Sequence, residues 1–213
     1  MSVVIKIRNM YLNYENKKIF NDFNLEINKG DFVCIYGKSG CGKSSLLNII
    51  GQLQKPNYGQ VLINNNRMQG SLNRCSKNFL RNEVSYLLQN LALLDDKTVF
   101  ENFDIELKLK NIDKSNKVKL CTDVLKKVGL DISFLHAKVY VLSGGEKQRV
   151  AIAKIMLKNT AIVLIDEPTA SLDSYNSELI FELLKEINES GTTLVVVTHD
   201  ENMLKYASTI IQI

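Results

Sequence analysis

The stretch that decides the fold reads GKSGCGKS, from Gly37 to Ser44, and fits the pattern G-x-x-x-x-G-K-[ST]. Its glycines let backbone N–H groups turn inward around the β- and γ-phosphates of a nucleotide, where side chains would not fit. Lys43 adds a cation, the start of the following helix adds partial positive charge, and the Ser44 hydroxyl suits Mg²⁺. The apolar strand Asp31–Tyr36 and the helix-like Lys43–Leu53 flank the loop, as this phosphate-binding pattern requires.

A second chemical element follows the continuous apolar run Ala161–Ile165 (AIVLI), which is typical of a strand buried on both faces. Asp166 and Glu167 come directly after it, and the carboxyl end of a buried parallel strand is the ligand-binding edge of a sheet. We expect Asp166 to hold Mg²⁺ and Glu167 to polarise an attacking water. Two acids after an apolar strand are common by themselves, but together with the phosphate loop they predict nucleotide hydrolysis.

The remaining pattern predicts an α/β fold with a mainly parallel sheet. Leu194–Val197 is a second buried strand, and the amphipathic helix Leu179–Ile187 precedes it and stops at Gly191. Val3–Arg8 and Phe23–Ile27 indicate an N-terminal antiparallel β subdomain. Shorter strands are expected at 61–63, 85–88 and 209–213. We predict one domain over residues 1–213, with a nucleotide-binding core and β subdomain in 1–88 and 160–213, and an inserted helical subdomain in 89–159.

Composition excludes several classes of protein. The chain has 213 residues, of which 45% are apolar and 23% charged, with a formal net charge of +4, so we expect no nucleic-acid partner. Four scattered cysteines without a C-x-x-C pair, and only two histidines, argue against a zinc site or a disulfide framework. The longest apolar runs fall well short of the ~20 residues of a membrane-spanning helix. We expect a cytoplasmic protein unless a partner holds it at a membrane.

A second phosphate-binding turn lies far along the chain, in LSGGEKQR at Leu142–Arg149. A Ser-Gly-Gly turn that opens a helix is another anion-binding terminus, so the chain has one more phosphate cradle than a single nucleotide needs. With this string the sequence resembles the ABC ATPase family, whose signature is L-S-G-G-x. The resemblance covers essentially the whole chain, and further family motifs follow in order.

Four more motifs carry the resemblance. Gln89 in YLLQN is similar to the Q-loop glutamine, 171–173 (SLD) to the D-loop, and His199 in VVVTHD to the switch histidine. Tyr14 falls where the family places an aromatic ring that stacks on adenine, although Tyr11 is a rival three residues earlier.

The resemblance implies that two copies pair head to tail around two ATP molecules. The signature turn of one copy then closes over the γ-phosphate held by the phosphate loop of the other, so an isolated monomer hydrolyses ATP slowly. The resemblance assigns catalysis to Lys43, Glu167 and His199. It assigns the binding of Mg²⁺ to Ser44, Gln89 and Asp166. The residues that it implies contact the nucleotide are Tyr14, Gly37, Lys38, Ser39, Gly40, Cys41, Gly42, Lys43, Ser44, Ser45 and Gln89. The signature comprises Leu142, Ser143, Gly144, Gly145 and Glu146, and the D-loop comprises Ser171, Leu172 and Asp173.

The segments Ser45–Gly51 and Tyr86–Glu101 resemble the macrolide-exporter and lipoprotein-release branch, and are most similar to the small ATPases of bacteriocin exporters. This favours an ATPase subunit that drives a separate membrane chain in export of a peptide, a bacteriocin or a hydrophobic compound, from the inner face of the cell membrane. Leu93, Leu94 and Thr98–Asn102 would then lie where a cytoplasmic helix of that chain docks. The alternative for most of these residues is that they pack the helical subdomain. A soluble single-cassette ATPase in an assembly role, such as iron–sulfur cluster assembly, stays open as the alternative.

Overall fold

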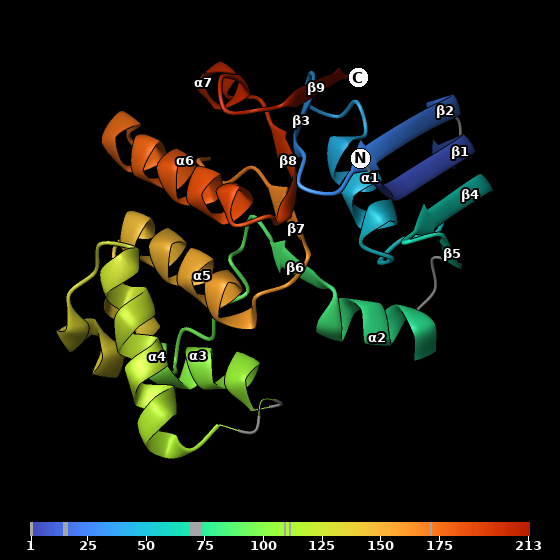
Figure 1. Cartoon of the computed structure of the whole chain (residues 1–213). Coiled ribbons are helices and arrows are strands. Elements are labelled where there is room, and N and C mark those ends of the chain that lie inside the picture. The colour runs from blue at the N-terminus through green and yellow to red at the C-terminus, as the bar shows by residue number, and fades with distance from the viewer. Residues whose placement is uncertain (1, 15–16, 69–73, 109, 111, 171) are drawn as a thin grey trace.

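Two β-sheets of opposite type form the framework (Figure 1). The structure, a computed structural model, describes residues 2–14, 17–68, 74–108, 110, 112–170 and 172–213. The strands are β1 (Val3–Tyr14), β2 (Lys17–Asn28), β3 (Phe32–Tyr36), β4 (Tyr58–Ile63), β5 (Asn66–Met68), β6 (Val84–Leu87), β7 (Ile162–Asp166), β8 (Thr193–Thr198) and β9 (Thr209–Gln212). The parallel sheet has the order β6–β7–β8–β3–β9 and the antiparallel sheet the order β2–β1–β4–β5. Both predicted sheet types are confirmed.

The helices lie around and between the two sheets (Figure 1). They are α1 (Lys43–Ile50), α2 (Arg74–Asn82), α3 (Val99–Leu107), α4 (Lys114–Lys127), α5 (Gly144–Lys158), α6 (Ser174–Glu189) and α7 (Glu201–Leu204), with 3₁₀ turns at Ile132–His136 and Val139–Val141. Helix α1 packs between the two sheets, whereas α5 and α6 cover the other face of the parallel sheet. Helices α3 and α4 lie beyond α5 and form the predicted helical region.

The parallel strands are apolar throughout because both of their faces are buried. In β3, Phe32 and Cys34 belong to the cluster under α5 and α6, while Val33 and Ile35 belong to the cluster around α1. The same alternation continues through β7 and β8. Burial on two faces stabilises such a strand by about 1.5–3 kcal/mol for each large aliphatic side chain, which explains the continuous runs in the sequence.

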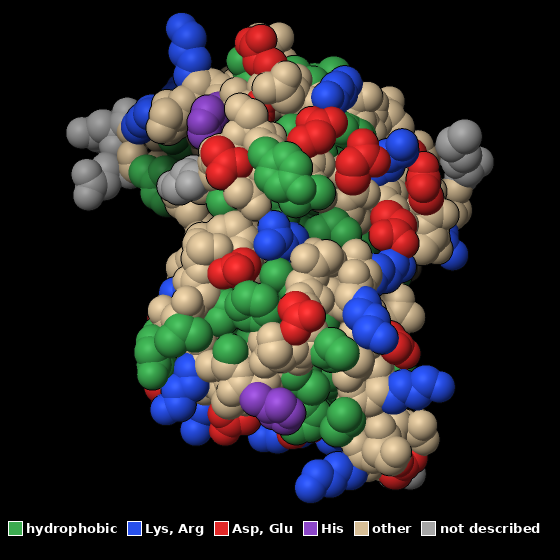
Figure 2. Space-filling view, turned by 90° about the vertical axis from the view of Figure 1, so that its left-hand side faces the viewer, with side chains coloured by type: hydrophobic (Ala, Val, Ile, Leu, Met, Phe, Trp, Pro, Cys, Tyr) green, Lys and Arg blue, Asp and Glu red, His purple; other side chains and the backbone are tan. Residues whose placement is uncertain are grey.

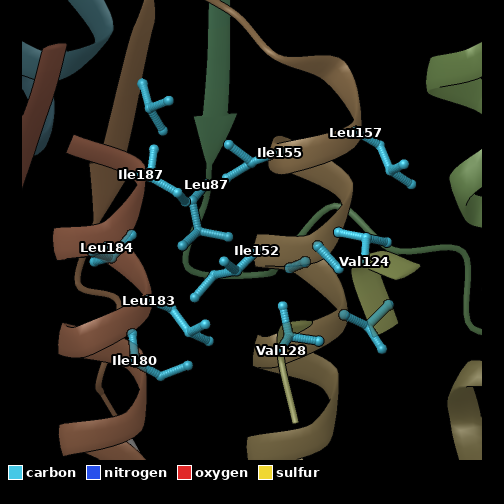
Figure 3. Close-up of a cluster of buried hydrophobic side chains, with 14 of the residues drawn as sticks. Leu87, Val124, Val128, Ile152, Ile155, Leu157, Ile180, Leu183, Leu184 and Ile187 are labelled. Carbon is cyan, nitrogen blue, oxygen red and sulfur yellow. The ribbon is translucent and has the colours of Figure 1, made fainter. Parts of the chain in front are cut away.

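The helical region is joined to the sheet through α5. Figure 3 shows side chains of α6, such as Leu183 and Ile187, directed toward Ile152 and Ile155 of α5. On its other side α5 meets Val124 of α4. One continuous apolar cluster therefore connects the sheet with the helices that carry the signature turn.

The surface is mixed in charge. Figure 2 shows basic and acidic side chains interspersed over one face, with hydrophobic side chains more frequent over its lower half, where the helical region lies. Within the described part of the chain, no helix is long and apolar enough to cross a membrane.

Two features differ from the sequence prediction. The strand expected at 61–63 is twice as long, and it turns through Asn64 and Asn65, both at positive φ (49° and 61°), into β5. Such a pair suits a tight hairpin turn. Helix α2 was not predicted, because its segment is mostly polar, and among its residues with described side chains only Phe79 is fully buried.

Candidate active site

A cavity of about 1200 Å³ opens at the carboxyl end of the parallel strands. It brings together the predicted phosphate loop, the two carboxylates, Gln89, Tyr14 and His199. Among the residues that the structure describes, its lining includes none of the signature residues and neither Leu172 nor Asp173 of the D-loop. The lining comprises Tyr14, Lys17, Ile19, Tyr36, Gly37, Lys38, Ser39, Gly40, Cys41, Gly42, Lys43, Ser44, Ser45, Gln89, Asp166, Glu167, Ala170, His199, Gln212 and Ile213.

The phosphate loop is closed tightly around its own lysine. Gly42 has φ 109°, and a Cβ atom there would lie 2.3 Å from Ile19 Cγ2, so only glycine fits directly before α1. Lys43 is 7% exposed, and its Nζ atom donates to the carbonyls of Gly37 (2.8 Å) and Lys38 (3.1 Å). The ammonium group is therefore held at the centre of the loop, where phosphate oxygens would gather.

A hydroxyl and a carboxylate face each other at the base of the cavity. The Ser44 hydroxyl donates to Asp166 Oδ1 at 3.2 Å. Burial raises the pKa of Asp166, and the adjacent Glu167 raises it further, against the bond from Ser44 and the charge of Lys43. Two hard oxygen donors and an undercompensated negative charge fit Mg²⁺.

That cation would need more ligands than these two. In the ranges that the structure describes, no group of three or more His, Cys, Asp or Glu side chains could hold a metal ion. Mg²⁺ commonly uses one or two protein oxygens and takes the rest from substrate phosphates and water. The site therefore fits a nucleotide-bound Mg²⁺ rather than a metal held by the protein alone.

Glu167 and His199 form a pair at the rim of the sheet. Glu167 adopts φ 50°, a left-handed conformation that is rare for a residue with a side chain, and its N–H donates to Val197 O at 2.9 Å. The Glu167 side chain is 17% exposed and lies 2.7 Å, oxygen to Nδ1, from the far more open ring of His199. This geometry directs a carboxylate into the cavity and keeps an imidazole beside it.

Tyr14, rather than Tyr11, lines the cavity. Its hydroxyl lies 3.1 Å from Ser45 Oγ on α1, and 46% of the residue is exposed. Tyr11 instead packs edge to face against Tyr58, with 6.5 Å between ring centroids. Tyr14 thus lines the cavity beside the phosphate loop.

Sequence reasoning missed Lys17, which pairs with Tyr14 across the β1–β2 hairpin. The Lys17 Nζ atom donates to Gly40 O at 3.0 Å and ties the hairpin to the phosphate loop. A pair of 12-residue strands would have suggested this neighbour, but the sequence pattern showed only their apolar parts.

The signature turn is exposed outside the cavity. Ser143 caps α5, and its N–H and hydroxyl donate to Glu146 Oε2 at 2.7 and 2.8 Å, which completes a capping box. A Cβ atom on Gly144 would have no atom within 4 Å. The turn therefore presents open backbone to whatever approaches it.

The described part of the D-loop leads into α6. Leu172 packs on the core, and Asp173 caps α6 by accepting from Asn176 N at 2.8 Å, whereas Ser171 lies outside the described residues. Asn176 Oδ1 also accepts from Arg149 Nη1 at 2.9 Å. The D-loop and the signature helix are thus connected within one chain.

The segment after Gln89 is likewise tied to the signature helix. Lys154 Nζ donates to Ala92 O at 3.2 Å, and Lys147 Nζ pairs with Asp95 at 3.2 Å. Polar contacts therefore join the segment after Gln89 to α5.

A phosphate loop, a carboxylate–histidine pair and a separate Ser-Gly-Gly turn define an ATPase of the cassette type. In agreement, residues 20–170 match the family described as ABC transporter, and residues 137–204 also match one described as AAA domain. The chain belongs to the ABC transporter family as an ATP-binding cassette, and it is an ATPase.

Particular relatives agree with this assignment. The lipoprotein-releasing system ATP-binding protein LolD of Francisella tularensis is 42% identical over 209 residues, which cover 94% of this chain and 89% of LolD. The ergothioneine transport ATP-binding protein EgtV of Helicobacter pylori is 38% identical over 94% of this chain and 92% of its own length.

A solved structure agrees as well. The dimeric post-hydrolysis state of the ATP-binding cassette MJ0796, bound to ADP and Pi, superimposes with a TM-score of 0.89 at 36% identity and covers 98% of this chain and 94% of that one. MJ0796 belongs to Methanocaldococcus jannaschii. The predicted lipoprotein-release branch is confirmed, and the similarity to bacteriocin exporters stays a prediction.

Proposed function

We propose that two copies of this cassette pair head to tail around two Mg-ATP and drive a separate membrane subunit. One observation carries the proposal: the signature turn, with exposed Ser143 and Gly144, lies outside the cavity that holds the phosphate loop and the two carboxylates. A phosphate cradle open to solvent needs a nucleotide from elsewhere, and a second copy supplies one. The dimeric relative MJ0796 supports the same arrangement.

In this proposal residues 1–213 act as one cassette and the cavity residues divide the work. The phosphate loop and Lys43 bind the triphosphate, while Tyr14 supports the base. Glu167 takes the proton of the attacking water, and His199 keeps that carboxylate aligned and contacts the γ-phosphate. When bound at Ser44, Asp166 and Gln89, Mg²⁺ would neutralise charge on the β- and γ-phosphates. Ser143 of the second copy completes the site.

Only part of the segment proposed to lie at the membrane partner is available on the surface. Val99 and Asn102 are fully buried, and the Asn102 side chain accepts from Leu94 N (2.8 Å) and donates to Leu94 O (3.1 Å). Most of 98–102 therefore packs the helical region, which agrees with the alternative interpretation of these residues. Leu94 (47% exposed) remains open. Tyr140 and Val141 are exposed near by, since Tyr140 N donates to Asp95 O at 3.1 Å.

For the cargo we propose export of a peptide, a bacteriocin or a hydrophobic compound, with the cassette held peripherally at the inner face of the cell membrane and without a nucleic-acid partner. The similarity to LolD, named for lipoprotein release, favours lipophilic cargo. EgtV, named for ergothioneine transport, is nearly as similar. Because cassettes this alike are named for such different cargo, cargo choice belongs to the membrane subunit.

Affinity purification tests this function. Tagged Glu167→Gln chain is isolated from detergent-solubilised membranes with Mg-ATP, beside Glu189→Gln, which makes the same chemical change on the exposed side of α6. We expect a multi-span membrane protein to co-purify in stoichiometric amount with the first variant. A soluble partner alone, with none of the chain in the membrane fraction, would support the assembly ATPase instead.

A further inference from the structure

The hydroxyl of Tyr14 is the middle of a chain of three side chains from separate segments. Gln54 Nε2, in the loop after α1, donates to Tyr14 Oη at 2.5 Å. Tyr14 Oη lies 3.1 Å from Ser45 Oγ, which follows the phosphate loop and lines the cavity. The base side of the cavity is thereby connected with its phosphate side.

Either hydroxyl can donate in the contact between Tyr14 and Ser45, and the chemistry of Gln54 favours Tyr14 as the donor. An amide N–H only donates, so the phenolic oxygen accepts, and its single proton is free to be given to Ser45 Oγ. Ser45 then keeps its own proton for another acceptor. Because Ser45 lines the cavity beside the loop Gly37–Ser44, the available acceptor is a phosphate oxygen of the nucleotide.

The backbone around Gln54 fixes the amide in place. Gln54 N donates to Asn48 O at 3.2 Å. Asn57, three residues further, donates from its N–H to Tyr11 O (3.0 Å) and accepts from Asn13 N (2.7 Å) through its side chain. The loop after α1 is therefore bonded along the end of β1, where Tyr14 lies.

We propose that Gln54 is a positioning residue for ATP: it holds the ring of Tyr14 and orients the hydrogen-bond chain so that Ser45 donates to the phosphates. The proposal rests on the proposed place of Tyr14 beside the base. It makes the affinity for ATP depend on a glutamine that touches neither the base nor the phosphates.

The isosteric variant Gln54→Glu tests the direction of the chain. A carboxylate only accepts, so Tyr14 donates to it, and the Tyr14 oxygen then takes the proton of Ser45. We expect the dissociation constant for Mg-ATP and the KM to rise about tenfold in Gln54→Glu and about threefold in Gln54→Ala, with kcat unchanged, since losses of this size match one or two hydrogen bonds. Gln60→Glu adds the same charge on exposed β4 and should change neither constant.

Two substitutions of Tyr14 distinguish the possible outcomes, and titration calorimetry measures Mg-ATP binding in each. In Tyr14→Phe, which keeps the ring and removes the hydroxyl, Gln54→Glu should no longer weaken binding. A tenfold loss that persists there is plain charge repulsion and overturns the proposal. Tyr14→Ala checks the proposed function itself. If Tyr14→Ala leaves ATP binding unchanged, the proposed role of Tyr14 beside the base is wrong. If Tyr14→Ala weakens binding, but Gln54→Glu binds Mg-ATP as tightly as Gln60→Glu, only the proposed role of Gln54 is wrong.

Discussion

His199 Nδ1 lies 2.7 Å from Glu167 Oε2, and the N–H of His199 donates to the same oxygen at 3.3 Å, although 32 residues separate the two along the chain. They meet because β7 and β8 are parallel neighbours that end at the same sheet edge. Two contacts to one oxygen restrict the carboxylate to a single orientation, which general-base catalysis requires.

Glu167→Gln should abolish turnover and trap an ATP-bound dimer, because an amide takes no proton from water. We expect the rate of phosphate release to fall at least about 100-fold, the usual contribution of a general base. Size-exclusion chromatography with Mg-ATP should show a dimer that the wild-type chain loses by hydrolysis. Glu189→Gln serves as the matched control. A wild-type rate in Glu167→Gln would mean that another group is the base.

Lys43→Ala should weaken Mg-ATP binding by about tenfold or more, since it removes a charge-assisted contact to the phosphates. Equilibrium dialysis with labelled ATP measures the loss. Lys55→Ala removes an exposed lysine outside the cavity lining and should bind as wild type does. If the two variants bound Mg-ATP with equal affinity, Lys43 would not contribute to ATP binding.

Asp166→Asn should make the nucleotide-free chain more stable and end Mg²⁺-dependent ATP binding. Because folding raises the pKa of Asp166 above 3.8, its stabilising contribution is present at lower pH and is lost as the pH rises through the raised pKa. At pH 7 the ionised carboxylate therefore costs stability, and the amide removes that cost.

We expect the Tm of Asp166→Asn at pH 7 to rise by about 2–4 °C, as for ~1 kcal/mol in a chain of this size. The gain should shrink as the pH approaches 4. A lower Tm at pH 7, in thermal scans without nucleotide, would contradict the assigned cause of the shift.

Alkylation of Cys41 should block ATP hydrolysis, and Mg-ATP should protect against it, because Cys41 is partly exposed and lines the cavity. Cys34 and Cys121 are internal controls: both are buried, and burial raises their pKa to about 12 and about 11. Peptide mass spectrometry on a Cys75→Ser background gives the rates. Equal labelling rates of Cys41 with and without nucleotide would contradict the prediction, to which the alternative is an inert, shielded thiol.

The site could be predicted where its chemistry is local. The phosphate loop, and the strand that ends in Asp166 and Glu167, carry their own flanking elements, so pattern and spacing suffice. Contacts that depend on the register of distant segments could not be predicted. Gln54 contacts Tyr14, 40 residues away in the sequence, and Lys17 contacts Gly40, 23 residues away. Both contacts form only because the end of the long β1–β2 hairpin lies beside the phosphate loop.

The helical region shows the same limit. The sequence predicted a helical subdomain over 89–159, but its pattern did not distinguish exposed from buried positions in 98–102. Asn102 is polar and yet fully buried, because its amide satisfies the backbone of Leu94. That pairing is invisible until the chain is folded.

The most direct test of the central claim mixes two inactive variants. Lys43→Ala disables the phosphate loop and Ser143→Arg disables the signature turn, so each homodimer has two dead sites. If the turn acts across the dimer, a mixed dimer has one site with both parts intact, and an equal mixture should regain up to about a quarter of the wild-type ATPase rate. A mixture that hydrolyses ATP no faster than the mean of its two components, at every ratio, would contradict the head-to-tail pairing.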